Sequence, residues 1–216
     1  MFIERIPRLF APLYEKAAVM AGERYYKQVA EDVVTRLKAG KILDLGTGPG
    51  HLPIEIARSS TAIVVVGIDL SAKLIEAAKR NALRAGLEKR IHFQTGNASS
   101  LEFPDGSFDM VISTGMLHML RNPVKVIEEI YRVLKPGGEA WIYDPARISS
   151  QISPREWRAS LSLRERLTFK LFQLFARINR PREYHREQVT ELVSQTPFRT
   201  SEIAEQGGEI RLTLLK

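Results

Sequence analysis

Cysteine is absent from all 216 residues of the chain. A protein without thiols has no disulfide bonds, no thiolate ligands for zinc and no cysteine nucleophile. These classes of site are therefore excluded, and we expect no metal centre.

Long hydrophobic runs are also missing. No window approaches the roughly 18 to 20 consecutive apolar residues that a helix needs to cross a bilayer. The N-terminal stretch "MFIERIPRLFAPLYEK" carries charges where a signal peptide would be apolar. We therefore expect a cytoplasmic protein. With 44% hydrophobic residues, the chain is long enough for one domain with a full core.

Acidic residues are scarce in only one segment. The net charge is +7, and between Arg147 and Arg186 ten Lys and Arg residues face three Glu residues, an excess of seven. The rest of the chain is therefore balanced. A local excess of this kind favours an anionic partner or substrate over a general coating of nucleic acid.

From Lys41 onward, short apolar runs alternate with amphipathic stretches. The second expected helix has Ser71 as its N-cap and Gly86 as its stop. Strands alternating with helices predict a parallel sheet that is covered on both faces. The expected strands are 41–46, 62–70, 91–96, 108–114 and 139–144, and the expected helices are 51–60, 71–86 and 123–138.

The two flanks depart from this alternation and complete the predicted organisation. Residues 1–40 form a helical flap, 41–145 a Rossmann-like core, 146–190 a basic helical insertion or lid, and 191–216 the final strand pair. The last two strands form a hairpin that turns at Gly207-Gly208. The predicted fold is α/β, a doubly wound seven-stranded sheet that is mostly parallel, with an antiparallel last strand.

Three glycines follow the first expected strand in "KILDLGTGPGHLPIEIA". Gly46, Gly48 and Gly50 let the backbone turn sharply and approach a ligand closely. Asp69 ends the second strand, where its carboxylate is placed to accept hydrogen bonds from both hydroxyls of a ribose. Loop and acid together predict a cofactor that contains adenosine. NAD and S-adenosylmethionine both satisfy this pattern.

Four stretches together resemble the successive motifs of class I S-adenosylmethionine-dependent methyltransferases. They are "ILDLGTGPGHLPIEIA", "VVGIDLSAKLIEAAKRNA", "GNASSLEFPDGSFDMVIS" and "EIYRVLKPGGEAWIYD". The branch that the chain resembles contains the ubiquinone and menaquinone biosynthesis methyltransferases, and the resemblance covers 41–144. It implies methyl transfer from S-adenosylmethionine, with S-adenosylhomocysteine as product. The flanks do not match well enough to carry over an acceptor.

The resemblance also implies a set of cofactor-binding residues. Asp44 matches an acid near the methionine amino group, and a carboxylate in an apolar strand needs such a cation. Leu70 lies beside the adenine, and Tyr14 folds over the cofactor from the N-terminal flap unless it is an ordinary core tyrosine. The full set is Tyr14, Asp44, Gly46, Thr47, Gly48, Gly50, Asp69, Leu70, Asn97, Ala98 and Thr114.

Asn97 departs from the family pattern. Where the family often has Gly-Asp-Ala, this chain has Gly96-Asn97-Ala98. The amide oxygen of Asn97 still accepts a hydrogen bond from the adenine amino group, but without the strength that a charge adds. The alternative is that Asn97 is a plain turn residue.

His118 follows the fourth expected strand in "STGMLHML". The Asn/Asp-Pro-Pro-aromatic signature of amino-group methyltransferases acting on adenine or glutamine is absent there. The expected acceptor is therefore an oxygen, nitrogen or carbon nucleophile of a small molecule. His118 is a candidate general base, or else a helix-start histidine bonded to backbone. We expect His51 to be structural.

The insertion contains "LSLRERLTFKLFQLFARINRPREYHRE", with a stripe of leucines and phenylalanines among basic residues. Three interpretations remain open: a lid whose stripe packs on the sheet domain, an anionic-membrane surface over 155–186, and arginines that recognise an acidic or phosphorylated acceptor. Nucleic-acid binding is less favoured, because the aromatic residues follow the apolar stripe. Tyr184 and His185 are further candidates for lining an acceptor pocket.

Two rival functions remain at this point. One is an RNA methyltransferase that holds phosphates with the basic insertion. The other is a non-catalytic regulatory protein that binds S-adenosylmethionine. A nicotinamide dehydrogenase ranks last, because no Tyr-x-x-x-Lys relay follows the fourth strand. No feature of the sequence sets an oligomeric state.

Overall fold

A computed structural model of the chain describes residues 9–144, 155, 159–178, 184–206 and 209–216. The helices are α1 Ala11–Arg36, α2 His51–Ser59, α3 Ala72–Arg84, the 3₁₀ helix η1 Leu117–Met119, α4 Pro123–Val133, α6 Leu163–Ile178 and α7 Arg186–Ser194. The strands are β1 Gly40–Leu45, β2 Ile63–Asp69, β3 Ile91–Thr95, β4 Phe108–Thr114, β5 Leu134–Asp144, β6 Thr200–Gln206 and β7 Glu209–Leu215.

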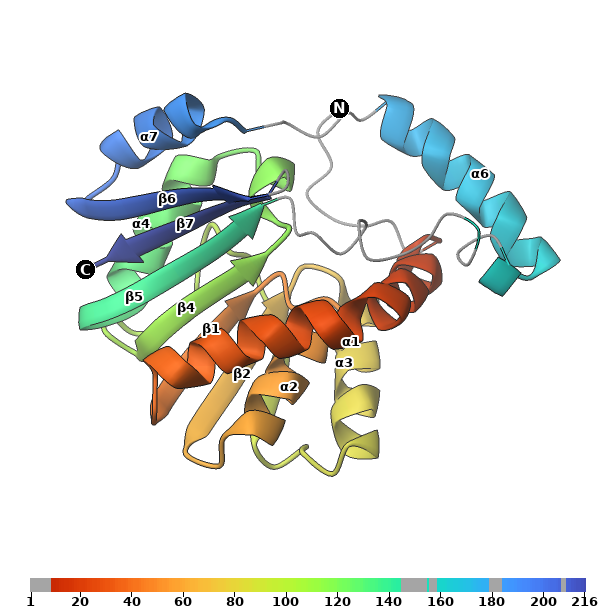
Figure 1. The fold of residues 1–216 in the computed structure, drawn as a ribbon, viewed down its shortest axis with the longest axis horizontal. Helices are drawn as coiled ribbons and strands as arrows, with labels where there is room; N and C mark the ends of the chain where they lie inside the picture. Colours follow the sequence, from red (N-terminus) through yellow and green to blue (C-terminus); the bar gives the residue numbers. More distant parts are fainter. Residues whose placement is uncertain (1–8, 145–154, 156–158, 179–183, 207–208) are drawn as a thin grey trace.

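The seven strands form one sheet in the order β3-β2-β1-β4-β5-β7-β6 (Figure 1). Neighbours from β3 to β5 pair in parallel, whereas β7 is antiparallel to both β5 and β6. This confirms the predicted fold class. Strand order reverses between β1 and β4, the position at which open α/β sheets bind their ligands.

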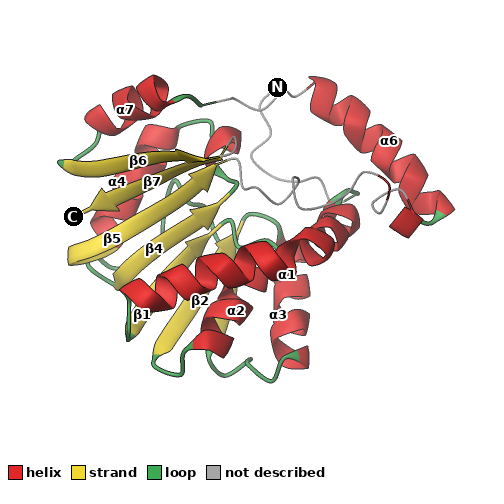
Figure 2. Ribbon diagram, in the orientation of Figure 1, coloured by secondary structure: helices red, strands yellow, loops and turns green. Residues whose placement is uncertain are grey.

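Helices cover both faces of the sheet (Figure 2). One buried apolar cluster joins α1, α2 and α3 to the sheet, and a second joins α4 and α7 to the other face. β1 lies between the two layers, and its apolar residues Ile42, Leu43 and Leu45 are fully buried. The carboxyl ends of the central strands are thereby fixed by packing on both sides.

Local sequence signals explain where most helices begin and end. Ser71 caps α3 by accepting a hydrogen bond from the Leu74 N–H, and Gly86 follows the helix in a left-handed conformation. The expected helix over 123–138 is wrong in its last five residues. α4 ends at Val133, and Leu134 already pairs with Phe108 in the sheet. Pro136 cannot continue a helix, because it has no N–H to donate.

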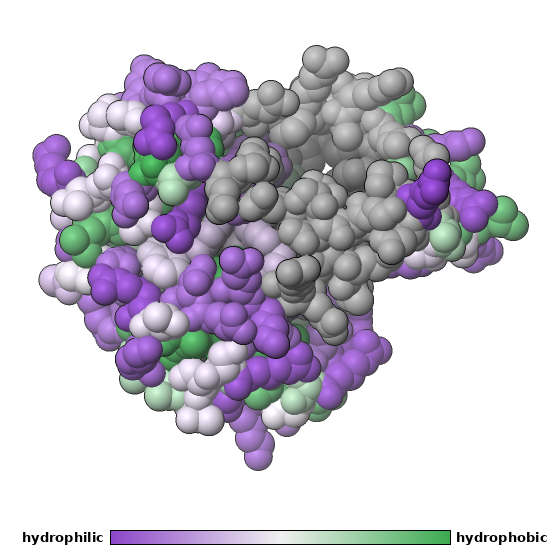
Figure 3. All heavy atoms as spheres, in the orientation of Figure 1, coloured by the Kyte–Doolittle hydropathy of each residue, from purple (hydrophilic) through white to green (hydrophobic). Residues whose placement is uncertain are grey.

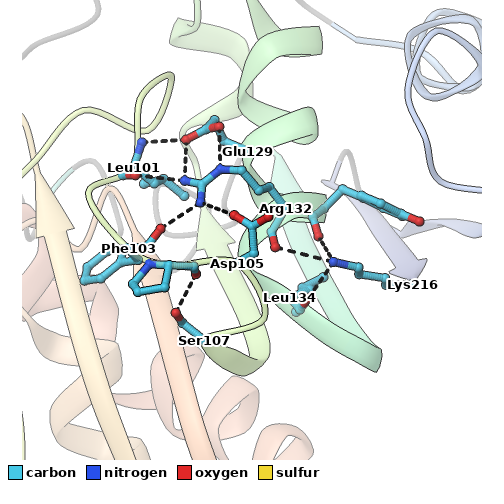
Figure 4. Close-up of polar contacts among 10 residues, drawn as sticks. Leu101, Phe103, Asp105, Ser107, Glu129, Arg132, Leu134 and Lys216 are labelled. Atoms are coloured by element: carbon cyan, nitrogen blue, oxygen red, sulfur yellow. Dashed lines mark hydrogen bonds and ion pairs between the residues drawn. The ribbon is translucent and has the colours of Figure 1, made fainter.

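Arg132, in the last turn of α4, ties the loop after β3 to the helix (Figure 4). Its guanidinium donates to both carboxylate oxygens of Glu129 and to the carbonyl oxygens of Leu101 and Phe103, at 2.7 to 2.9 Å. It also forms an ion pair with Asp105 at 2.8 Å. The loop held in this way leads back to Asn97, at the carboxyl edge of the sheet.

The basic insertion contains α6, which Figure 1 shows extending away from the sheet beside the first turns of α1. Its leucines Leu163, Leu167, Leu171 and Leu174 are exposed. The interpretation that these four residues pack on the sheet domain is therefore wrong. The side chains of Phe172, Phe175, Arg177 and Ile178, and the turn at Gly207-Gly208, lie outside what the structure describes.

None of the helices in the described part of the chain could cross a membrane.

Candidate active site

The glycine loop connects β1 to α2 at the carboxyl edge of the sheet. Gly50 is the residue before α2 and has a φ of 80°. A Cβ at this position would lie 2.7 Å from Cζ of Phe93 and 2.9 Å from Cβ of Ala78. Only glycine fits such a conformation and such a close approach. The loop therefore packs tightly against α3 and β3.

Asp69, the last residue of β2, is held by backbone donors on both sides. Its Oδ2 accepts a hydrogen bond from the Gly48 N–H at 3.0 Å, and its Oδ1 accepts one from the Ser71 N–H at 2.8 Å. Burial raises the pKa of this carboxyl group, and the two N–H donors lower it in part. Each oxygen keeps a further lone pair. The carboxylate is thus fixed in orientation and still able to accept from a diol.

A cavity lies between the carboxyl ends of β1, β2, β3 and β4. It brings together six of the predicted cofactor residues, namely Gly46, Asp69, Leu70, Asn97, Ala98 and Thr114. Its other lining residues are Ile68, Leu74, Gly96, Ser99, Gly115, Met116, Met119 and Leu120. The lining is mostly apolar, with one carboxylate at its edge. This combination suits a flat aromatic base attached to a sugar.

Asp44 on β1 and Thr47 in the glycine loop do not line the cavity. Both are buried, and neither Oδ1 of Asp44 nor Oγ1 of Thr47 has a hydrogen-bond partner among the described residues. Burial, with the charge of nearby Asp69, raises the pKa of Asp44 to about 7. The Thr47 side chain lowers this pKa in part, but Oδ1 of Asp44 has no hydrogen-bond donor among the described residues. A buried carboxylate oxygen in this state is costly unless a ligand supplies a donor.

Asn97 is exposed at the end of β3, and its Oδ1 accepts a hydrogen bond from the Ser99 N–H at 2.9 Å. This is the turn geometry that the alternative interpretation anticipated. The oxygen keeps one lone pair, so Asn97 remains able to accept from an adenine amino group. Tyr14 lies within α1, but its side chain is outside the described residues.

His118 lies on η1, just after β4, and its ring meets a buried acid. Nδ1 of His118 is 2.8 Å from Oδ1 of Asp144, and the His118 N–H donates to Oδ2 of the same carboxylate at 3.1 Å. Asp144 is the last residue of β5 and is 2% exposed. The imidazole is therefore oriented by a carboxylate and not by a backbone carbonyl.

Sequence reasoning missed Asp144 and the methionines of the loop. An acid at the end of the fifth strand was a usable signal, because the carboxyl ends of neighbouring parallel strands meet at one edge. Met116 and Met119, on either side of His118, carried no signal beyond their position after β4. Of the other candidates, Tyr184 packs against the apolar cluster that includes residues of α7, and His185 precedes that helix, its N–H donating to Oε1 of Gln188.

These residues fit S-adenosylmethionine. Asp69 presents free lone pairs to a ribose, the apolar lining suits an adenine, and the unpartnered Asp44 oxygen is on β1, just before the loop, where the methionine amino group is expected. NAD would satisfy the first two features. The orphaned acid is the feature that distinguishes a cofactor with an ammonium group.

Comparison with known sequences agrees with this chemistry. The family model described as "Methyltransferase domain" matches residues 37–196. A ubiquinone/menaquinone biosynthesis C-methyltransferase of Geotalea daltonii is 29% identical over 65% of this chain and 63% of its own length. The 27-O-demethylrifamycin SV methyltransferase of Amycolatopsis mediterranei is 37% identical over 50% of this chain and 40% of its own length. The chain thus spans less than two thirds of these relatives.

Solved structures share the fold. A candidate S-adenosyl-L-methionine-dependent methyltransferase of Methanococcus maripaludis aligns with a TM-score of 0.77 at 23% identity, over 100% of this chain and 97% of its own. Phosphoethanolamine N-methyltransferase 2 of Haemonchus contortus, solved with S-adenosyl-L-methionine, aligns with a TM-score of 0.61 at 22% identity. The alignment covers 83% of this chain and 38% of that one. The chain therefore belongs to the methyltransferase domain family, and it shares its fold with S-adenosylmethionine-dependent methyltransferases.

Proposed function

We propose that the chain transfers a methyl group from S-adenosylmethionine to a hydroxyl oxygen of a small, largely apolar acceptor, with His118 as the general base. The observation that carries this proposal is the 2.8 Å contact between Nδ1 of His118 and Oδ1 of the buried Asp144. A base is needed only when the acceptor loses a proton as it attacks.

The chain's own residues bind and orient the cofactor. Asp69 accepts from the ribose hydroxyls, Asp44 from the amino group, and Leu70 and Ala98 contact the adenine. Methyl transfer from a sulfonium needs mainly alignment in a site that excludes water, because the methyl group is already activated. The tight packing of the glycine loop supplies that alignment.

His118 removes the acceptor's proton. Asp144 accepts from the Nδ1–H, which leaves Nε2 unprotonated and able to take the hydroxyl hydrogen. S-adenosylmethionine supplies the methyl carbon, whose bond to sulfur breaks with its electron pair as the acceptor oxygen bonds to it, leaving S-adenosylhomocysteine. The imidazolium that forms is stabilised by the carboxylate of Asp144 and returns its proton to solvent.

The lining of the cavity and the relatives support the acceptor class. Met116, Met119 and Leu120, in the same loop as His118, give the cavity an apolar wall that adapts to ring systems. The relatives carry names that refer to C-methylation in quinone biosynthesis and to a 27-O-demethylrifamycin. Both names support a small acceptor, and only the second supports an oxygen as the methylated atom. Quinols and hydroxylated aromatics combine a flat apolar body with an acidic hydroxyl.

Release of S-adenosylhomocysteine measures turnover, and fragmentation of the methylated product in a mass spectrometer shows whether the methyl group is on oxygen or on carbon. A methyl group on carbon would contradict the proposal. A naphthoquinol and a catechol are compared with primary amines of similar size. We expect turnover with the hydroxylated acceptors and a loss of about 100-fold in kcat for His118→Gln. His92→Gln, at an exposed histidine on β3, is the matched control and should retain full activity. Turnover with amines alone, or cofactor binding without transfer to either set, would overturn the proposal.

A further inference from the structure

Helix α6 presents a row of leucines to solvent. Leu163, Leu167, Leu171 and Leu174 have exposed fractions of 84%, 64%, 46% and 57%. Spacings of four, four and three residues put them on one face of the helix. They are four of the eight large hydrophobic side chains that are exposed in the described part of the chain. An apolar surface gathered in this way on one helix indicates a partner.

The opposite face of α6 is the one that joins the rest of the protein. Glu165 lies on the far side of the helix from the leucines, and both of its carboxylate oxygens accept hydrogen bonds from Nζ of Lys16, on α1, at 3.0 Å. Oε2 of Glu165 also accepts from the Ser162 N–H at 2.7 Å, which caps the helix. α6 is thus held by the face that carries Glu165, and its leucine face is exposed.

Basic side chains flank the leucine row. By helical position, Arg164 lies on one side of the row and Lys170 on the other, and both are exposed. The only acid in α6 is Glu165, which is engaged with Lys16 on the other face. Figure 3 shows hydrophilic and hydrophobic side chains side by side on this projecting part of the molecule. The outward face is therefore apolar in the middle and positive at its edges.

We propose that the outward face of α6 docks the protein on an anionic lipid bilayer. The leucines enter the boundary between headgroups and acyl chains, while Arg164 and Lys170 reach up to the lipid phosphates along their apolar stems. The excess of seven basic residues between Arg147 and Arg186 adds attraction to a negative surface. Docking does not depend on the acceptor proposed above.

The same face suits the other occupants less well. Exposed leucines contribute little to RNA binding, because proteins bind RNA through cationic side chains and stacked aromatic rings. A second copy of the chain would bring the flanking cations of two α6 helices together, which costs binding energy through like-charge repulsion. Anionic lipid matches both the apolar row and its basic edges.

Flotation of the full chain with lipid vesicles tests this proposal. Vesicles of phosphatidylcholine alone are compared with vesicles that contain about one-third phosphatidylglycerol. We expect binding to the anionic vesicles that weakens as salt rises. Leu167→Glu with Leu171→Glu should lower it at least tenfold, and Arg164→Gln or Lys170→Gln should each lower it about fivefold.

Leu83→Glu on α3 is the matched control, because Leu83 is as exposed as Leu167, at 64%. It should bind vesicles as the unaltered chain does. Retained binding of S-adenosylhomocysteine shows that each variant is folded, and flotation needs no methyl acceptor, so failure here is separate from failure of the proposed reaction. Equal flotation of the double leucine variant, equal binding to neutral vesicles, or a dimer or RNA complex abolished by the same leucine changes would overturn the proposal.

Discussion

The buried carboxylate of Asp144 contacts His118 through both of its oxygens. One lies 2.8 Å from Nδ1 of the ring, and the other accepts the backbone N–H of the same histidine at 3.1 Å. β5 and the loop after β4 are thereby joined at the edge of the sheet where the cavity lies. One acid thus holds the histidine at its ring and at its backbone, which fixes the direction of the ring.

Asp144→Asn is expected to lower kcat by about 100-fold, because an amide cannot stabilise the imidazolium and favours the wrong tautomer. The affinity for S-adenosylhomocysteine should stay within about twofold, since Asp144 bonds to His118 and has no role in the proposed cofactor contacts. Steady-state kinetics and calorimetry on the same preparation measure both. A kcat close to that of the unaltered chain would show that the carboxylate only supports the fold.

Asp44 should make cofactor binding depend on pH. Burial raises the pKa of its carboxyl group to about 7, so below that pH the free protein holds this group protonated. An ammonium ligand favours the charged form, so binding must release the proton. Affinity for S-adenosylhomocysteine should therefore fall as pH drops below 7, by up to about tenfold per unit. Calorimetry in buffers of different ionisation enthalpy should count about one proton released at pH 6.

The raised pKa of Asp44 also makes the stability of the free protein depend on pH, and this dependence is opposite in direction to that of cofactor binding. The folded state binds the Asp44 proton more tightly than the unfolded chain does, so the free energy of unfolding from this group is greatest below pH 4 and declines up to about pH 7. Asp44→Asn should remove both trends. Denaturant unfolding between pH 5 and 8 measures the second, and an unchanged pH profile in the variant would exclude Asp44 as the titrating group.

Gly50→Ala is expected to destabilise the fold by about 2 to 4 kcal/mol, because it adds a clash to a strained backbone conformation. The new Cβ would lie 2.7 Å from the Phe93 ring. Gly86→Ala is the matched control: its φ is similarly positive at 68°, but nothing lies within 4 Å of an added Cβ. It should cost only about 1 kcal/mol. Equal losses, measured in urea, would mean that packing of the loop contributes nothing.

Arg132→Lys should lower the free energy of unfolding by about 1 to 3 kcal/mol. Lysine keeps the charge but cannot bond Glu129, Leu101 and Phe103 at once, as the guanidinium does in Figure 4. Arg80→Lys, on the exposed face of α3, should change stability by less than about 0.5 kcal/mol. Similar values for the two variants would contradict the role given to Arg132.

The spacing of apolar residues, together with the residues that begin and end helices and strands, predicted most of the sheet. Buried strands such as β1 and β2 have apolar runs bounded by glycine and aspartate, and α3 has both its cap and its stop in the sequence. The boundary between α4 and β5 was missed because "RVLKPGG" continues an amphipathic pattern. The pairing of Leu134 with Phe108 makes Leu134 the first residue of β5. This contact joins residues far apart in the sequence, so the local pattern does not predict it.

The candidate site was predictable where it depends on backbone geometry. The glycine loop and Asp69 are adjacent to strand ends that can be located from the pattern, so their convergence follows from parallel topology. The partnership of His118 with Asp144 was not predictable, because it depends on the register of β5 and on the turn of η1. The outward orientation of the α6 leucines likewise depends on the Lys16–Glu165 contact, which joins segments far apart in the chain.

Calorimetric titration with S-adenosylhomocysteine tests the central claim, that a carboxylate at the end of β2 anchors the adenosine of the cofactor. We expect saturable one-to-one binding by the unaltered chain, at least about 100-fold weaker binding by Asp69→Ala, and unchanged binding by the exposed control Glu88→Ala. Undiminished affinity in a folded Asp69→Ala protein would contradict it.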